Sequence, residues 1–241
     1  MTALLEINGL SKSFRGLKAV QNVSCAVPQG EIFAVIGPNG AGKTTLFNMI
    51  AGAFKPDAGT ITFAGDRTDG LPPDAVCRLG IGRTFQIVRP FPALTVHDNI
   101  VVGALLRQHD TVLASKRAHE IMRQLGLYDK RDMVASSLTL PDRKRLEVAR
   151  SLATDPKLLL LDEVMAGLRP TETDRMVDIL RELNRGGLTI VLIEHVMRAV
   201  MALARHVLVL HHGEAIAQGE PAKVVRDPAV VTSYLGTEVV D

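Results

Sequence analysis

A glycine-rich stretch in the first fifth of the chain has the spacing of a phosphate-binding loop. Residues 37–44 read Gly-x-x-x-x-Gly-Lys-Thr, after an apolar run at 32–36 and before a helical pattern that begins at Leu46. A strand, a glycine-rich turn and a helix in this order predict a loop whose backbone N–H groups surround a β-phosphate. The Lys43 ammonium would contact the β- and γ-phosphates, and the Thr44 hydroxyl would bind Mg²⁺. The alternative is an ordinary strand–turn–helix junction, because glycine-rich turns are common. The predicted phosphate-binding residues are Gly37, Pro38, Asn39, Gly40, Ala41, Gly42, Lys43, Thr44 and Thr45.

Two acidic residues follow a second apolar run. Leucines occupy 158–161, and Asp162 and Glu163 come next. A carboxylate at the end of a buried strand beside a phosphate loop can hold Mg²⁺ or its water shell, and we assign this role to Asp162. Glu163 would orient or deprotonate the water that attacks the γ-phosphate. The alternative for Asp162 is that it only caps the segment that follows.

Two further polar residues end predicted strands. Gln86 ends a strand predicted from Ile81, where its amide could touch Mg²⁺ or the attacking water, or could be only a polar strand end. His195 follows the apolar run 189–193 and could hydrogen-bond the γ-phosphate, unless it faces solvent. The other histidines lack metal-ligand spacing.

The composition is that of a globular protein of a reducing compartment. The 241 residues suffice for one large domain or for a domain with an inserted subdomain. A net charge of +2 argues against a nucleic-acid-binding protein. Cys25 and Cys77 lie in apolar surroundings and predict no disulfide framework. We find no signal-peptide pattern and no run of the roughly 18–20 apolar residues that span a bilayer. Work at a membrane would therefore require another chain to supply the span.

Hydrophobic patterns divide the chain into three parts. Residues 3–36 alternate like antiparallel strands, with a turn at 28–30 and Phe14 between two strands. From 88 to about 153 the periodicity is helical, with helices expected to begin after Thr95, at Ser115 and at Pro141. Beyond 158, strands alternate with helices, which predicts a parallel sheet with right-handed crossovers.

In the order of these motifs the chain resembles the ATP-binding subunits of ABC transporters. The phosphate loop, Gln86, the Asp162–Glu163 pair, the following Ala-Gly-Leu at 166–168 and His195 match that family across essentially the whole chain. The resemblance implies an α/β fold in which a RecA-like P-loop NTPase core carries an N-terminal antiparallel β-subdomain and an inserted α-helical subdomain. Within a single domain, 1–241, the core would take 1–87 and 154–241, and the helical subdomain 88–153.

The resemblance also implies cofactors and partners. Head-to-tail dimers would enclose two ATP molecules with Mg²⁺, beneath transmembrane permease subunits at the cytoplasmic face of the inner membrane. An external solute-binding protein would take part indirectly. By the same resemblance Phe14 would stack on the adenine ring. The alternative is a core phenylalanine buried in a strand.

Several stretches are similar to a subgroup, the branched-chain amino acid uptake systems. These stretches are 38–48, which ends in Leu-Phe-Asn, Gly82-Arg83-Thr84-Phe85-Gln86, Ile193-Glu194-His195 and Tyr234-Leu235-Gly236. Such systems typically use two different ATPase subunits, so the resemblance implies a heterodimer, with a homodimer as the alternative. The permease and the binding protein select the solute in this family, which leaves related small polar solutes open.

The family signature Leu-Ser-Gly-Gly-Gln is altered in this chain. Its position holds Leu138, Thr139, Leu140, Pro141 and Asp142. Pro141 has no N–H for a phosphate. Asp142 would place a negative charge near a triphosphate, a repulsion of about 4 kcal/mol at ~4 Å and an effective dielectric constant near 20. Arg143 and Lys144 would offset part of it.

In a head-to-tail dimer each signature serves the ATP bound to the opposite subunit. The altered signature therefore predicts an unequal pair of sites. One, with Lys43, Asp162, Glu163 and His195, would hydrolyse ATP against the partner's signature, and the other, closed by residues 138–142, would bind ATP with weak or no turnover. Val164 stands where the family usually has proline, and we expect a change in loop stiffness only.

The function expected from the sequence is an ATPase that couples ATP hydrolysis to solute uptake. One alternative is a soluble ABC ATPase that acts on nucleic acid or the ribosome, against which the small net charge argues. Another is a nucleotide-binding regulatory subunit with little turnover, against which Glu163 and His195 argue.

Overall fold

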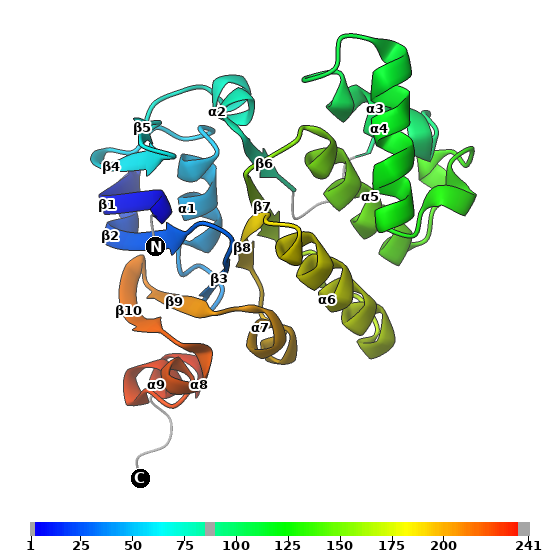
Figure 1. Cartoon of the computed structure of the whole chain (residues 1–241). Coiled ribbons are helices and arrows are strands. Elements are labelled where there is room, and N and C mark those ends of the chain that lie inside the picture. Colours follow the sequence, from blue (N-terminus) through cyan, green and yellow to red (C-terminus); the bar gives the residue numbers. More distant parts are fainter. Residues whose placement is uncertain (1–2, 85–89, 236–241) are drawn as a thin grey trace.

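The computed structural model describes residues 3–84 and 90–235, and within them the chain forms two sheets and several layers of helices (Figure 1). Phe85, Gln86 and Gly236, all named above, lie outside the described residues.

The N-terminal sheet is antiparallel, as predicted. Its strand order is β2-β1-β4-β5. The predicted place of Phe14 between two strands is wrong, because the first two strands form one long hairpin that turns at Arg15 and Gly16. Phe14 is the last residue of its strand and pairs with Leu17. The strands are β1 (Ala3–Phe14), β2 (Leu17–Pro28), β4 (Ala58–Phe63) and β5 (Asp66–Arg67).

The second sheet has six strands in the order β10-β9-β3-β8-β7-β6. The neighbours from β9 to β6 are parallel, as predicted, and only β10 runs antiparallel to β9. The carboxyl ends of β3, β7 and β8 therefore meet at one edge of the sheet, which is where ligands bind in such folds. The strands are β3 (Ile32–Ile36), β6 (Ile81–Arg83), β7 (Leu158–Asp162), β8 (Thr189–Ile193), β9 (His206–His211) and β10 (Glu214–Gly219).

Helices cover both faces of the six-stranded sheet. Helix α1 (Lys43–Ile50) lies between the two sheets, and its Leu46 and Phe47 are buried in one cluster with residues of both. On the opposite face, α6 (Pro170–Arg185) and α7 (Met197–Leu203) pack against the sheet (Figure 1). The remaining helices of this part are α2 (Pro73–Leu79), α8 (Pro221–Val224) and α9 (Pro228–Leu235).

The insert between β6 and β7 is helical where the structure describes it. It contains α3 (Val96–Ala104), α4 (Thr111–Gln124), α5 (Leu140–Ala153) and the 3₁₀ turns Tyr128–Lys130 and Ala135–Ser137. Residues 90–153 add no strand to either sheet. Ile100, Ile121 and Leu146 belong to one buried cluster with strand β7, so the insert shares its core with the sheet. The exact limits of the predicted subdomain, 88 and 153, stay a prediction.

Capping decides where these helices begin. The Thr95 hydroxyl accepts a hydrogen bond from Asp98 N at 3.0 Å, which caps α3 as predicted. The predicted start of the next helix at Ser115 is wrong. Asp110 caps α4 instead, because its carboxylate accepts a hydrogen bond from Val112 N at 2.8 Å. Helix α5 begins at Leu140, with Pro141 in its first turn.

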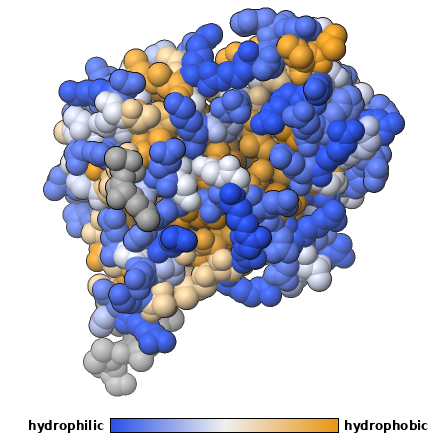
Figure 2. Space-filling model, in the orientation of Figure 1, coloured by the Kyte–Doolittle hydropathy of each residue, from blue (hydrophilic) through white to orange (hydrophobic). Residues whose placement is uncertain are grey.

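None of the helices in the described part of the chain combines the length and the apolar character needed to cross a membrane. Figure 2 shows that hydrophilic residues cover most of the visible face, with hydrophobic ones in smaller areas between them.

Candidate nucleotide-binding site

The glycine-rich loop packs tightly between β3 and α1. Gly37 and Gly42 have φ values of 147° and 100°. A Cβ atom on Gly37 would lie 2.1 Å from the Leu210 carbonyl oxygen, and one on Gly42 would lie 2.2 Å from that of Ala19. Only glycine fits at both positions. Gly42 is also the N-cap residue of α1, so the unpaired N–H groups of the first helical turn adjoin the loop, as an anion site requires.

Lys43 is buried within this loop. Its Nζ donates hydrogen bonds to the carbonyl oxygens of Gly37 and Pro38, at 2.8 and 2.9 Å. Burial lowers the pKa of Lys43, against the charges of Glu163 and Asp162, which raise it. The ammonium group is thus held inside the loop that it is predicted to serve.

A cavity of about 630 Å³ opens over the loop and brings together residues from distant parts of the chain. Phe14 lines it, with 38 % of the residue exposed and its ring edge-on to Phe54 at 5.2 Å. The alternative of a buried core phenylalanine is therefore wrong, and adenine stacking stays a prediction. Sequence reasoning missed Lys18 and His212, which only the topology brings to this cavity. Its lining includes Phe14, Lys18, Asn39, Gly40, Ala41, Gly42, Lys43, Thr44, Thr45, Glu163 and His212.

Asp162 ends β7 and is almost completely buried, with 1 % exposed. Its backbone N–H donates to the Thr84 hydroxyl at 3.1 Å, and its Oδ2 lies 3.5 Å from Nη2 of Arg83. Burial raises the pKa of Asp162, and the Arg83 charge opposes this. Oδ1 is buried without a hydrogen-bond partner in the part of the chain that the structure describes.

The oxygen atoms at this edge fit Mg²⁺. Asp162 offers its Oδ1, and Thr44, which carries a hydroxyl, lines the cavity. Among the described residues, no three His, Cys, Asp or Glu side chains cluster as in an all-protein metal cage. Mg²⁺ is commonly held by one or two protein oxygens together with substrate phosphates and water. Asp162 and Thr44 would hold the ion, which would neutralise phosphate charge.

Glu163 lines the cavity from a strained backbone position. Its φ is 51°, which is unusual for a residue with a side chain. Its N–H donates to Ile193 O at 3.0 Å, and its carbonyl accepts from Lys144 Nζ at 2.9 Å. Lys144 is only 5 % exposed, and burial lowers its pKa, against several nearby carboxylates. The sequence suggested Lys144 as a partner of Asp142, whereas the structure brings it from α5 to Glu163.

Glu194 and His195 follow β8 at the same edge. Glu194 is buried, and its Oε1 accepts a hydrogen bond from Met165 N at 2.8 Å, which ties it to the segment after Glu163. Burial raises the pKa of Glu194. His195 is exposed and does not line the cavity over the loop. Its predicted contact with the γ-phosphate stays a prediction.

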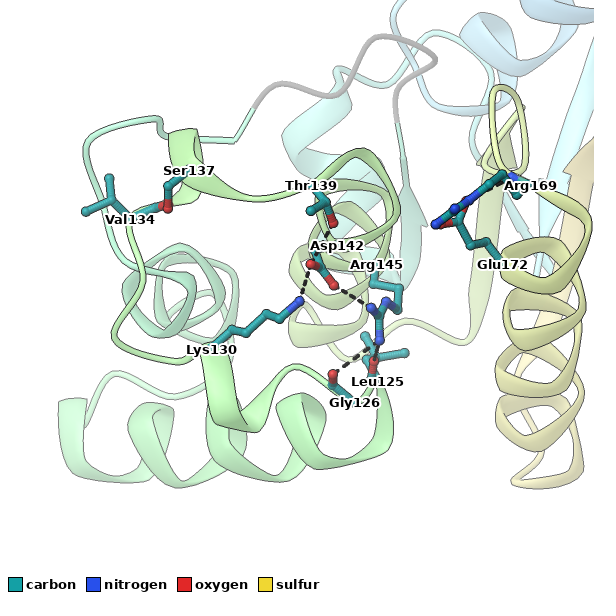
Figure 3. Close-up of polar contacts among 10 residues, drawn as sticks. All are labelled: Leu125, Gly126, Lys130, Val134, Ser137, Thr139, Asp142, Arg145, Arg169 and Glu172. Atoms are coloured by element: carbon teal, nitrogen blue, oxygen red, sulfur yellow. Dashed lines mark hydrogen bonds and ion pairs between the residues drawn. The ribbon is translucent and has the colours of Figure 1, made fainter.

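At the altered signature position the carboxylate of Asp142 points into the protein (Figure 3). It is 2 % exposed and accepts hydrogen bonds from Lys130 Nζ, from Arg145 and, at 2.7 Å, from the Thr139 hydroxyl. Arg145 also donates to the carbonyl oxygens of Leu125 and Gly126. Burial raises the pKa of Asp142, but its hydrogen bonds and the two cations outweigh burial and hold that pKa below its ordinary value.

The expected partners of Asp142 are therefore wrong. Lys130 and Arg145 compensate its charge, whereas Arg143 is exposed and Lys144 reaches Glu163. Lys130 lies 12 residues away in a 3₁₀ turn, and sequence spacing alone gave no signal for the contact. The Thr139 hydroxyl hydrogen is directed to Asp142, so the signature position has lost this donor as well as the N–H that proline lacks.

Comparisons with known proteins agree with this geometry. A family model described as ABC transporter matches residues 20–166, and another, described as branched-chain amino acid ATP-binding cassette transporter, matches 216–240. The high-affinity branched-chain amino acid transport ATP-binding protein LivG of Salmonella typhimurium is 41% identical, over 97% of this chain and 98% of its own length. The lipopolysaccharide export system ATP-binding protein LptB of Escherichia coli is 36% identical over 98% of each.

Solved structures are similar over nearly the whole chain. A nucleotide-free ATP-binding cassette from an ABC transporter superposes with a TM-score of 0.89 at 30% identity, covering 98% of this chain and 100% of its own. A cassette solved in an ADP conformation gives a TM-score of 0.89 at 31% identity, with the same coverage.

The Asp142 cluster generates a stability prediction. Replacing Asp142 with Ala leaves buried Arg145 without its carboxylate, and we expect the free energy of unfolding at pH 7 to fall by about 3 kcal/mol. Because the pKa of Asp142 is lowered on folding, its stabilisation is present above the unfolded carboxyl pKa of about 3.9 and is lost as the pH falls through the lower folded value. In urea denaturation, the difference in the free energy of unfolding between wild type and Asp142→Ala should be constant between pH 7 and 5. It should narrow only below about pH 4.

Asp129→Ala, at an exposed position of the neighbouring 3₁₀ turn, is the matched control, with an expected change within about 0.5 kcal/mol. A gap below ~1 kcal/mol at pH 7 for Asp142→Ala would show that the ion pairs do not stabilise the fold.

Proposed function

The chain belongs to the ABC transporter family, and we propose that it is the ATP-hydrolysing subunit of an importer for branched-chain amino acids or a related small polar solute. ATP-binding proteins of this family are ATPases coupled to transport, and the solved cassettes confirm the predicted ABC ATPase fold. The observation that carries the proposal is the cavity in which the phosphate loop, Phe14 and Glu163 meet.

The residues of this cavity support a division of labour in the reaction ATP + water → ADP + phosphate. The loop N–H groups and Lys43 bind the phosphate oxygens. Glu163 faces the same cavity and acts as the general base or the orienting group for the attacking water. Asp162 and Thr44 would hold Mg²⁺, which would screen the phosphate charge, and His195 and Gln86 would complete the predicted catalytic set.

Two similarities support the choice of solute. The C-terminal match at 216–240 is to a branched-chain amino acid transporter family, and LivG carries that substrate class in its name. LptB, which is nearly as similar, is named for lipopolysaccharide export. Overall sequence similarity of the cassette therefore distinguishes only weakly between transport systems. The permease and an external solute-binding protein would select the solute at the membrane, with this chain on the cytoplasmic face.

The altered signature supports a heterodimer with two unequal ATP sites. The signature of each subunit would serve the nucleotide of the other, so the site with this chain's phosphate loop receives the partner's signature. The opposite site receives Thr139, whose hydroxyl already donates to Asp142, and Pro141, which has no N–H. That site would bind ATP weakly and turn over slowly or not at all.

Glu163→Gln tests the catalytic assignment. In the complex purified with its permease and partner ATPase, we expect the ATPase rate to fall at least ~100-fold, because a general base contributes roughly 10²–10⁴. ATP binding should persist, since the phosphate loop is intact. Glu182→Gln, on the exposed side of α6, should leave the rate unchanged. Equal rates for wild type and Glu163→Gln would refute hydrolysis at this site and favour a regulatory subunit.

Pro141→Ala tests the asymmetry without disturbing the Asp142 cluster. It restores one N–H at the start of α5, and a hydrogen bond to a charged phosphate contributes about 1.5–3 kcal/mol. We expect the weaker of two ATP dissociation constants in the complex to tighten by roughly tenfold, measured by calorimetry in the Glu163→Gln background. Pro73→Ala, in the first turn of α2, is the control. Two ATP sites of equal affinity and equal turnover in the wild type would contradict the proposal.

Lys144→Met tests whether α5 positions Glu163. Loss of the ammonium that binds the Glu163 carbonyl should lower kcat about tenfold, by the same charge-assisted hydrogen-bond energy, with little change in KM for ATP. Lys144→Arg should retain part of the rate, and exposed Lys157→Met should retain all of it. A raised KM with unchanged kcat would assign Lys144 to nucleotide binding instead.

A further inference from the structure

The side chain of Arg83 joins the phosphate-loop helix to the predicted magnesium carboxylate. Its Nη1 donates a hydrogen bond to Asn48 Oδ1 at 2.7 Å, and its Nη2 lies 3.5 Å from Asp162 Oδ2. The Arg83 side chain is 10% exposed. The guanidinium is therefore fixed between α1 and the carboxyl end of β7, largely away from solvent.

The backbone around Arg83 is fixed as well. Arg83 pairs with Leu160 across β6 and β7, and its carbonyl accepts a hydrogen bond from the Ser151 hydroxyl at 2.6 Å. The next residue, Thr84, accepts a hydrogen bond from Asp162 N through its hydroxyl at 3.1 Å. Two consecutive residues thus hold Asp162: Thr84 binds its backbone N–H, and Arg83 lies beside its carboxylate.

These contacts connect two stretches that are similar to the branched-chain subgroup, 38–48 and 82–86, through residues that had no predicted role of their own. Asn48 ends the first stretch, and Arg83 and Thr84 lie in the second, 35 and 36 positions further along the chain. In the structure Arg83 and Thr84 contact Asp162 directly, and Asn48 is linked to it through Arg83.

The two carboxylate oxygens of Asp162 are in different situations. Oδ2 faces Arg83, whereas Oδ1 has no hydrogen-bond partner among the described residues. An arginine stays protonated in proteins, so its charge is permanent. One oxygen is thereby paired with a fixed cation, and the other is left for a metal ion or its water.

This arrangement has opposite effects on free nucleotide and on Mg²⁺. A carboxylate beside the phosphate loop repels a polyphosphate that arrives without metal, and buried charges interact strongly. A fixed cation next to that carboxylate reduces the repulsion. The same cation repels Mg²⁺, so it lowers the gain in nucleotide affinity that the metal provides.

We propose that Arg83, anchored by Asn48, is a built-in counter-ion of Asp162 that lets the site bind nucleotide before Mg²⁺ and limits how strongly binding depends on the metal. This inference rests on the proposed function, because it assumes that Asp162 faces the Mg²⁺–nucleotide. Arg83 is a positioning and charge-balancing residue, without a contact to the reacting atoms.

The test compares ATP affinity with and without the metal. ATP dissociation constants of the purified complex are measured by displacement of a fluorescent nucleotide, once with Mg²⁺ and once with EDTA, in the Glu163→Gln background. The ratio of the EDTA value to the Mg²⁺ value reports metal dependence. Arg83→Gln should raise this ratio at least tenfold, and Arg83→Lys, which keeps a charge, should change it less than threefold. Arg78→Met, exposed on α2, is the control.

A double-mutant cycle assigns the effect to Asp162. In an Asp162→Asn background, Arg83→Gln should raise the ratio clearly less than it does with Asp162 present, because only the direct repulsion between Arg83 and Mg²⁺ is then removed. If Arg83→Gln leaves the ratio unchanged in the presence of Asp162, lowers it, or shifts it equally in both backgrounds, the counter-ion role is refuted. Should Arg83→Gln fail to fold, Asn48→Ala removes only the anchor and must raise the ratio in the same direction.

Failure of the proposed function is recognised separately. If Asp162→Asn alone leaves the wild-type ratio unchanged, then Asp162 does not serve the metal, whatever Arg83 does.

Discussion

Burial of charge at the carboxyl ends of β7 and β8 is the constraint on which the site depends. Asp162 and Glu194 are each 1 % exposed, because their strands lie inside a sheet that is covered on both faces. A buried carboxylate is tolerated only when cations and hydrogen bonds compensate it. The cations come from three elements that are distant in sequence: Lys43 from α1, Arg83 from β6 and Lys144 from α5. The catalytic edge is therefore complete only when all three elements are docked.

Helix α5 connects the two functions that the dimer would divide. The altered signature runs into its first turn and is predicted to face the partner's nucleotide. Lys144, two residues after Asp142, binds the Glu163 carbonyl in this chain's own site. The left-handed backbone of Glu163 is held from both sides, by Ile193 on its N–H and by Lys144 on its carbonyl. Such strained positions persist only where the surroundings define them fully. A displacement of α5 would thus be felt at Glu163 without a change in the phosphate loop.

What sequence reasoning could predict depended on the range of the interactions. The phosphate loop is local, since strand, turn and helix are contiguous, and the apolar runs at 158–161 and 189–193 indicated buried parallel strands correctly. Charge partners were not predictable in this way. Residue spacing suggested Arg143 and Lys144 for Asp142, whereas the fold selects Lys130 and Arg145. The Asn48–Arg83 contact and the approach of His212 to the loop likewise require the sheet order, which no local pattern contains.

The negative charge of Asp142, at the altered signature position, is paired by residues of this same chain. A signature that had merely decayed would be expected to leave a buried carboxylate or hydroxyl without partners, since nothing would select for them. Here the carboxylate has two cations and the Thr139 hydroxyl, and Arg145 is bound further by the carbonyls of Leu125 and Gly126 (Figure 3). Because an unpaired buried carboxylate would be costly, we expect these partners to stabilise the helix start in its present form. The structure thus combines a helix start, whose buried carboxylate is paired, with a signature poor in phosphate donors, and this combination supports the proposed inequality of the two ATP sites.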